Sequence, residues 1–167
     1  ATGKDLSFKN IADYYFNEMG NVLVLRTTKA PRDSASANAV VLYHLATNKR
    51  DTILKGGNDF KGFAFNEDGS KLAFVAERDT AKKAPTKYYS LYYYQMGEDS
   101  ARLLVDKASP GMSLGTTVSE HSNLSFSKSG NRVLFGTAPL PVAKDTSLID
   151  IDLVKLDIWH YNDDYLQ

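Results

Sequence analysis

The chain contains no cysteine in its 167 residues, which excludes disulfides and thiolate metal sites. It also lacks a net charge, since twenty basic residues balance twenty acidic ones. That balance argues against nucleic acid or an anionic membrane as the main partner. No apolar run approaches the length of a membrane-spanning helix, and the opening residues 1–5 do not resemble a signal peptide. Helix signals are few, whereas ten tyrosines and eight phenylalanines are typical of an all-β protein.

A ten-residue pattern occurs three times, at 16–25, 65–74 and 126–135. Each copy starts with Phe, continues with Asn or Ser, has Gly at the fifth position and ends in a largely apolar run. An aromatic or apolar residue also stands two positions upstream each time. Such self-similarity is the sequence signature of a repeat architecture.

Each copy predicts a β-hairpin. The upstream pairs, such as Tyr14 and Phe16, alternate with period two and belong on one face of a strand. The Asn/Ser-x-x-Gly segment has the residues typical of a tight turn, in which we expect Gly20, Gly69 and Gly130 to adopt positive φ. The apolar run that follows suits a strand buried on both faces.

The similarity continues beyond the hairpin. Tyr43 and Tyr92 each lie twenty-three residues after the repeat glycine, and Trp159 lies twenty-nine residues after it. We interpret these aromatics as marking third strands, with apolar fourth strands at 52–54 and 102–105. Four antiparallel strands per repeat are typical of a β-propeller blade.

The sequence therefore predicts an all-β fold, a partial β-propeller with two complete four-stranded antiparallel blades plus most of a third. We expect a single propeller fragment over 1–167, with blades at about 8–56, 60–108 and 120–167. The third copy reaches Gln167 without a fourth strand, whereas propellers close with about four to eight blades. We therefore expect the chain to be part of a larger polypeptide and to self-associate through its open edges.

The last repeat carries a family resemblance, in Val118–His121, Leu124–Ser127, Phe135–Pro139 and Leu156–Gln167. These residues resemble the N-terminal propeller region of bacterial serine peptidases of the prolyl oligopeptidase/dipeptidyl-peptidase family. The Asp-Ile-Trp-x-Tyr-x-Asp-x-x-Leu-Gln ending, read from Asp157, is the most specific part.

The resemblance implies a non-catalytic part of a serine peptidase that gates substrate and acts as a scaffold. The implied partners are the remaining blades, a C-terminal α/β-hydrolase domain and the parent's peptide substrate, and no cofactor is implied. The implied location of the parent is extracytoplasmic, periplasmic or secreted. Dipeptide-trimming relatives hold the substrate's amino terminus with paired propeller glutamates, and the absence of an adjacent Glu-Glu here means that this role is not carried over. The alternative is the propeller of a non-enzymatic extracytoplasmic binding or scaffold protein, which the hairpins fit equally.

Gly111–Gly115 matches the Gly-x-Ser-x-Gly nucleophile elbow around Ser113, and Asp150 or Asp152 and then His160 follow in the hydrolase order. That elbow requires a buried strand before the serine and a helix after it. Here a proline-containing loop precedes it and a β-prone segment follows it. We therefore assign no catalytic residue to this chain.

The remaining candidates are weighed similarly. We expect His44 and His160 to share a structural position in their repeats, and His121 beside Glu120 to pack or to hydrogen-bond. An acidic cluster lacks the glycine turn of a calcium loop and suits a solvated loop better, so we predict no metal site. Its members are Asp145, Asp150, Asp152, Asp157, Asp163 and Asp164.

Two surface features stay open between a functional and a structural interpretation. The long loops between second and third strands should emerge at one end of the propeller and suit either a docking surface or a solvated face. The loop at 77–87 is basic, through Arg78, Lys82, Lys83 and Lys87. The tyrosine run at 88–94 suits either a β-strand or a carbohydrate-binding platform, and we favour the strand. Strand alternation sends Tyr93 to the face opposite Tyr92 and Tyr94, so the rings cannot form one flat platform.

Overall fold

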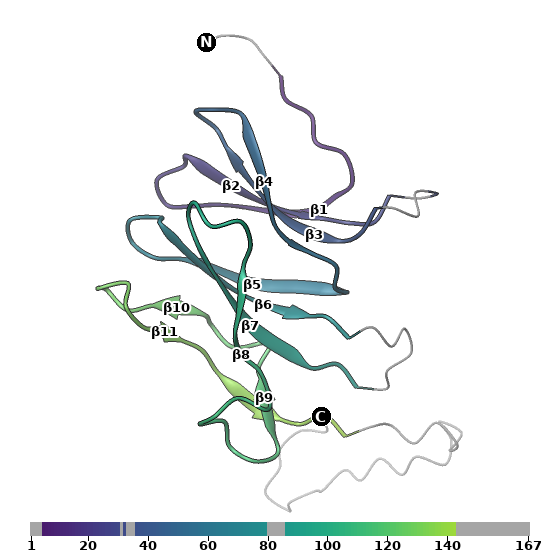
Figure 1. The fold of residues 1–167 in the computed structure, drawn as a ribbon, viewed down its shortest axis with the longest axis vertical. Helices are drawn as coiled ribbons and strands as arrows, with labels where there is room; N and C mark the ends of the chain where they lie inside the picture. Colours follow the sequence, from purple (N-terminus) through teal and green to yellow (C-terminus); the bar gives the residue numbers. More distant parts are fainter. Residues whose placement is uncertain (1–4, 31, 33–35, 80–85, 143–167) are drawn as a thin grey trace, which may run out of the picture.

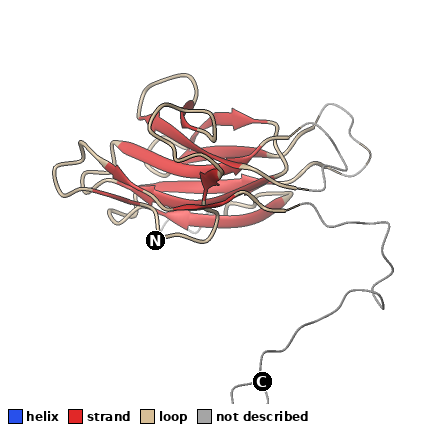
Figure 2. Cartoon of the chain, turned by 90° about the horizontal axis from the view of Figure 1, so that it is seen from below, coloured by secondary structure: helices blue, strands red, loops and turns tan. Residues whose placement is uncertain are grey.

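The structure, a computed structural model, describes residues 5–30, 32, 36–79 and 86–142. Every regular element in these ranges is a β-strand, and the strands lie in stacked layers (Figures 1 and 2). This confirms the predicted all-β class. No helix long and apolar enough to cross a membrane occurs among the described residues.

The first layer is a four-stranded antiparallel sheet in the order β1-β2-β3-β4. Its strands are β1 (Ile11–Phe16), β2 (Val22–Thr27), β3 (Ala39–His44) and β4 (Lys49–Lys55). This is the blade-like sheet that the first sequence copy predicts.

The second layer repeats this arrangement. Its strands are β5 (Asp59–Phe65), β6 (Lys71–Glu77), β7 (Tyr89–Gln95) and β8 (Arg102–Val105), each antiparallel to the next. The predicted fourth strand at 102–105 coincides with β8.

The third layer contains the hairpin of β10 (Ser125–Phe126) and β11 (Val133–Leu134). The strand β9 (Thr116–Val118) pairs with β12 (Thr137–Pro139) and also meets β7. The third copy is thus joined to the second sheet by β9, a pairing that the sequence did not predict. Its expected third strand lies outside the described residues.

The three hairpin turns have the same geometry. Gly20, Gly69 and Gly130 have φ of 65°, 70° and 67°, as predicted for the repeat glycine. The amide of each donates to the carbonyl three residues earlier, at 2.9, 3.0 and 2.7 Å. The first turn residue, Asn17 or Asn66, also accepts through its side chain from an amide on the far side of the turn. The side chain and the glycine together close each turn.

Strand alternation builds the core between the first two sheets. Val22 and Val24 of β2 face Leu72 and Phe74 of β6 in one buried cluster. The intervening residues of β6 point the other way and pack with the third layer, in a cluster that includes Val75, Leu91, Phe126 and Val133. The β2 and β6 strands are therefore buried on both faces, as the apolar runs predicted.

The third strands differ in register from the sequence interpretation. Tyr43 stands opposite Leu23, whereas its counterpart by spacing, Tyr92, stands opposite Phe74. The residue that occupies Tyr43's position in the second sheet is Tyr94, opposite Leu72. The equivalence of Tyr43 and Tyr92 was therefore wrong by two residues. The two tyrosines of the second sheet, Tyr92 and Tyr94, still lie on the same face of β7, because side chains two residues apart in a strand point the same way.

Candidate functional site

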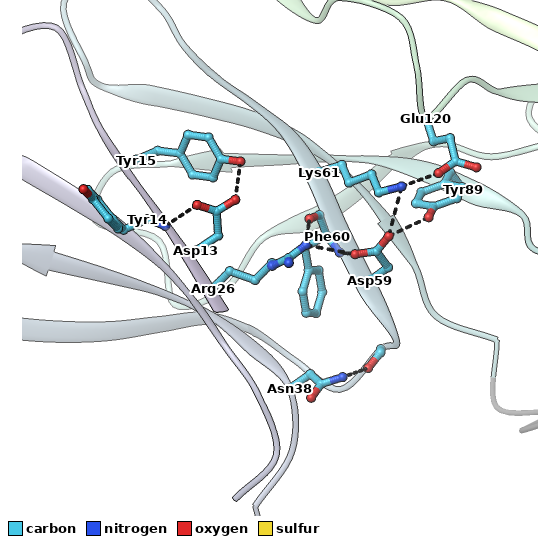
Figure 3. A network of polar contacts seen from close by, with 11 residues as sticks. Asp13, Tyr14, Tyr15, Arg26, Asn38, Asp59, Phe60, Lys61, Tyr89 and Glu120 are labelled. Atoms are coloured by element: carbon cyan, nitrogen blue, oxygen red, sulfur yellow. Dashed lines mark hydrogen bonds and ion pairs between the residues drawn. The ribbon is translucent and has the colours of Figure 1, made fainter. Parts of the chain in front are cut away.

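A network of charged and polar side chains joins the three layers at the end of the stack that carries the long loops (Figures 1 and 3). Arg26 lies near the end of β2, Asp59 and Lys61 lie at the start of β5, and Tyr89 begins β7. Glu120 follows β9. Antiparallel pairing puts Asp59 and Tyr89 at the same end of the second sheet, since both stand beside Glu77 of β6. Stacking of the sheets brings Arg26 and Glu120 next to them.

Asp59 is the centre of this network. Its Oδ1 accepts from Arg26 Nη1 and from the Phe60 amide, both at 3.0 Å. Its Oδ2 accepts from the Tyr89 hydroxyl at 2.7 Å and lies 3.2 Å from Lys61 Nζ. Both carboxylate oxygens are thus bonded, and the carboxylate links the first sheet to the second.

Lys61 extends the network to the third layer. Its Nζ donates to Glu120 and lies 5.3 Å from the centre of the Tyr89 ring. Glu120 Oε1 is also 3.8 Å from His121 Nε2. Two cationic groups, Arg26 and Lys61, therefore balance the two carboxylates of Asp59 and Glu120.

The pKa values of these groups follow from their partners. Burial raises the pKa of the Asp59 carboxyl, but hydrogen bonds from Tyr89 and Lys61 and the charges of Lys61 and Arg26 outweigh it, leaving the pKa below its ordinary value. Burial also raises the pKa of Glu120, and the bond from Lys61 reverses that effect. The Lys61 pKa is raised by its bonds to Glu120 and Asp59, against burial. Burial and the bond to Asp59 raise the pKa of Tyr89 strongly.

The arrangement is suited to holding the three layers together, because its positive and negative charges are matched and its carboxylates are held in the ionised form. The adjoining cavity measures about 80 Å³ and is lined by Arg26, Asn38, Asn58 and Asp59 among others. Clefts that bind small ligands usually enclose ~300–1,000 Å³. This cavity has room for a few waters and not for an organic ligand.

The loop that carries Ser113 does not form a nucleophile elbow. Ser113 lies between β8 and β9, exposed, and its carbonyl accepts from the Thr116 amide at 3.2 Å in a turn. The chain continues into a strand, β9, where the elbow requires a helix. The other members of that pattern, Asp150, Asp152 and His160, lie outside the described residues.

The histidines of the described residues are placed apart from the network centre. His44 Nε2 is 3.1 Å from Asp51 Oδ2 at the edge of the first sheet. His121, expected to pack or to hydrogen-bond, is 84% exposed in its side chain and does not pack in the core. Its amide donates to Ser119 Oγ at 3.2 Å, and its Nε2 lies 3.8 Å from Glu120 Oε1. No group of three metal-ligating side chains occurs in the part of the chain that the structure describes. The six aspartates of the acidic cluster lie outside it.

The tyrosines divide between two faces. Tyr92 and Tyr94 belong to the core between the first two sheets. Tyr93 points toward the third layer, where its ring centre lies 6.5 Å from that of Phe126, and Arg102 covers it at 4.8 Å. The run does not form one flat platform.

Sequence reasoning missed Arg26, Asp59, Lys61 and Tyr89 as a group, although it singled out Glu120 beside His121. Each of the four is ordinary in its own strand. The one available signal was that all of them stand at strand ends on the loop-bearing side.

These observations define a class, that of an all-β, propeller-like stack whose sheets are braced by an inter-blade polar network. No protein-family model and no curated protein matches the chain. Among solved structures, the crystal structure of TolB from Acinetobacter baumannii is similar, with a TM-score of 0.47 and 17% identity. The match covers 80% of this chain and 28% of that chain. A likeness of this degree supports no functional argument.

Proposed function

We propose that the chain is a non-catalytic β-propeller module that binds or holds a partner through its loop-bearing end. The observation that carries this proposal is the network of Asp59, Lys61 and Glu120. It braces three layers at the end where the 28–38 and 78–88 connections leave the sheets. Binding residues often lie on loops that a rigid scaffold positions.

The described part of the loop-bearing end is rich in cationic side chains. Arg78 is exposed, and its guanidinium donates to the Lys55 carbonyl at 3.1 Å and lies 5.8 Å from the Tyr92 ring. Lys107 Nζ covers the Tyr88 ring at 3.8 Å. Aromatic supports hold these cations in place at the surface, which suits an acidic partner surface or the carboxylates of a peptide.

A second candidate is the substrate-gating and scaffold region of a serine peptidase that resembles the prolyl oligopeptidase family. The specific observation in its favour is the sequence from Asp157 to Gln167, which lies outside the described residues. On this candidate the partners are further blades, an α/β-hydrolase domain and a peptide substrate. Both candidates place the parent outside the cytoplasm.

Two experiments test these proposals. A fluorophosphonate probe for active-site serines should fail to label the folded chain, and labelling that disappears in Ser113→Ala would overturn the non-catalytic proposal.

The native reading frame beyond Gln167 separates the two candidates. A downstream strand–Gly-x-Ser-x-Gly–helix unit followed by Asp and His supports the peptidase, whereas blades alone support the binding scaffold. A leader sequence at the start of the frame tests the location.

A further inference from the structure

The outer face of the first sheet, which is the face turned away from the second sheet, carries a row of apolar side chains. Strand alternation along β2 sends Leu23 and Leu25 to this face and their neighbours toward the second sheet. Tyr43 of β3 stands opposite Leu23 and extends the row. Leu23, Leu25 and Tyr43 are nevertheless buried, at 8%, 3% and 3% exposure. A group outside the sheet must therefore shield them from water.

That group is the N-terminal segment of residues 5–10, which we call the strap. Phe8 in the middle of the strap packs in one cluster with the three buried residues of the outer face. Its ring meets the Tyr43 ring edge to face, with 5.0 Å between the ring centres. Arg50, which stands opposite Tyr43 in β4, lies 4.9 Å from the centre of the Phe8 ring. Phe8 is thus held on the sheet by an aromatic contact and a cation–π contact.

The strap is fixed at its root by a left-handed residue. Asn10 has a φ of 56°, and the chain bends at residues 9–10 before it enters β1 (Figure 1). Asparagine is one of the few residues with a side chain that adopts this conformation readily. The Asn10 carbonyl accepts from the Thr28 amide at 2.8 Å and from the Thr28 hydroxyl at 3.3 Å. The backbone of residues 5–9 forms no hydrogen bond with the rest of the described chain, so Phe8 is the main attachment beyond the root.

The strap leaves one side of the outer face uncovered. Tyr14 and Phe16 of β1 lie beside Leu25 and Leu23 on this face and stay more than half exposed. If the strap left the sheet, these two aromatics would join the residues beneath it in one apolar surface. The chain has no net charge, so two copies do not repel each other. A second copy presents the same surface, and each copy can then cover the apolar residues of the other.

We propose that the outer face of the first sheet is an interface for a second copy of this chain and that the strap controls access to it. With Phe8 docked on Tyr43, the face is closed and the monomer is favoured. With Phe8 released, the face opens and a second copy docks on it. The strap and the second copy compete for the same surface, so whatever weakens one contact strengthens the other. This inference does not depend on the proposed function, which concerns the loop-bearing end.

The test measures the dimerisation of the full chain by sedimentation velocity over a series of concentrations. Phe8→Ala removes the ring that attaches the strap, and it should lower the apparent dissociation constant of the dimer several-fold. Leu6→Ala is the matched control, because Leu6 is an apolar strap residue that is 58% exposed. It should leave the dissociation constant unchanged. A Phe8→Ala chain that dimerises no more readily than the native chain would overturn the proposal.

A second variant releases the strap without removing Phe8. Alanine is strained at a φ of 56°, so Asn10→Ala should weaken the root of the strap and also strengthen dimerisation. Gly20→Ala is the control, because it introduces similar strain at a φ of 65° in a hairpin turn outside the strap. It should leave dimerisation as in the native chain. Equal strengthening by the two variants would mean a general loosening of the fold and would contradict control by the strap.

A double variant locates the interface. Phe8→Ala/Phe16→Glu places a charge on the opened face, and it should return the dissociation constant at least to the native value. Recovery of the monomer supports docking on the outer face of the first sheet. A double variant that dimerises as readily as Phe8→Ala would show that the copies meet elsewhere, and the proposal would be wrong.

Discussion

Asn17 in the first hairpin turn lies against Gly69 in the second, so closely that a Cβ atom on Gly69 would be 2.9 Å from Asn17 Nδ2. The next pair repeats the relationship, because a Cβ on Gly130 would be 3.1 Å from Asn66 Nδ2. Asn17 and Asn66 are buried, at 5% and 6% exposure. The turns are therefore stacked, and Gly69 and Gly130 each serve both their own turn and the asparagine of the turn before.

This stacking predicts a specific cost for Gly69→Ala. The substitution introduces left-handed strain of about 1 kcal/mol and a clash with Asn17. Gly20→Ala is the matched control, because Gly20 has a similar φ of 65° and a Cβ atom there would have no other heavy atom within 4 Å. Urea denaturation should show a clearly larger loss of unfolding free energy for Gly69→Ala. Equal losses would mean that the stacking contributes nothing beyond backbone strain.

Removal of the Asp59 carboxylate should weaken the joint between the first two sheets. Asp59→Ala removes the carboxylate that accepts from the Tyr89 hydroxyl and from Arg26, which keeps only its bond to the Phe60 carbonyl. We expect a loss of about 2 kcal/mol in unfolding free energy. The comparison variant is Asp51→Ala, whose ion pairs with Lys49 and His44 lie within one sheet at the surface. Asp51→Ala should lower the free energy of unfolding by less than Asp59→Ala does. The prediction fails if the two variants have the same denaturation midpoint.

The lowered pKa values of Asp59 and Glu120 predict a loss of stability in acid. A carboxyl whose pKa is lowered by folding contributes stability that is complete above its unfolded pKa and is lost as pH falls through the folded value. With ordinary pKa values of 3.8 and 4.5, the decline should begin below about pH 4.5. Urea midpoints measured from pH 7 to pH 3 test this. The double variant Asp59→Asn/Glu120→Gln should show a shallower decline over the same range.

The outer face of the first sheet predicts self-association of the isolated chain. Tyr14 and Phe16 are 61% and 53% exposed, and they stand opposite Leu25 and Leu23 on that face. Phe16→Glu should lower the apparent mass at high concentration in sedimentation or light scattering. Leu114→Glu is the control, because Leu114 is also apolar and is 102% exposed in the β8–β9 loop. This variant should leave the apparent mass unchanged. A native chain that stays monomeric at high concentration would count against this prediction.

The hairpins could be predicted from sequence because their determinants are local. Glycine at a positive-φ position and apolar alternation on either side fix a turn and two strands within about ten residues. The register of the third strands could not be predicted in the same way, since it depends on how long β2 and β6 continue before the chain turns. The spacing matched Tyr43 to Tyr92, while the ladder matches Tyr43 to Tyr94.

The polar network could not be predicted from the sequence for a different reason. Arg26 and Asp59 are thirty-three residues apart, and Lys61 and Glu120 are fifty-nine apart. Such pairs are set by how the sheets stack and not by any spacing within one strand. Pairing of β9 with β7 is likewise a product of stacking, because Val118 reaches Tyr89 only when the third repeat lies on the second.

The stacked turns have a direction. The first and second turns each present an asparagine side chain to the glycine of the turn that follows, so the two surfaces of the contact are different. A contact of this kind cannot be satisfied by two units related by a two-fold axis, as a self-complementary patch can. It is a heterologous contact, which repeats head to tail and ends only when the last unit meets the first. Within this chain the Asn17–Gly69 contact therefore fixes the direction in which one sheet follows another.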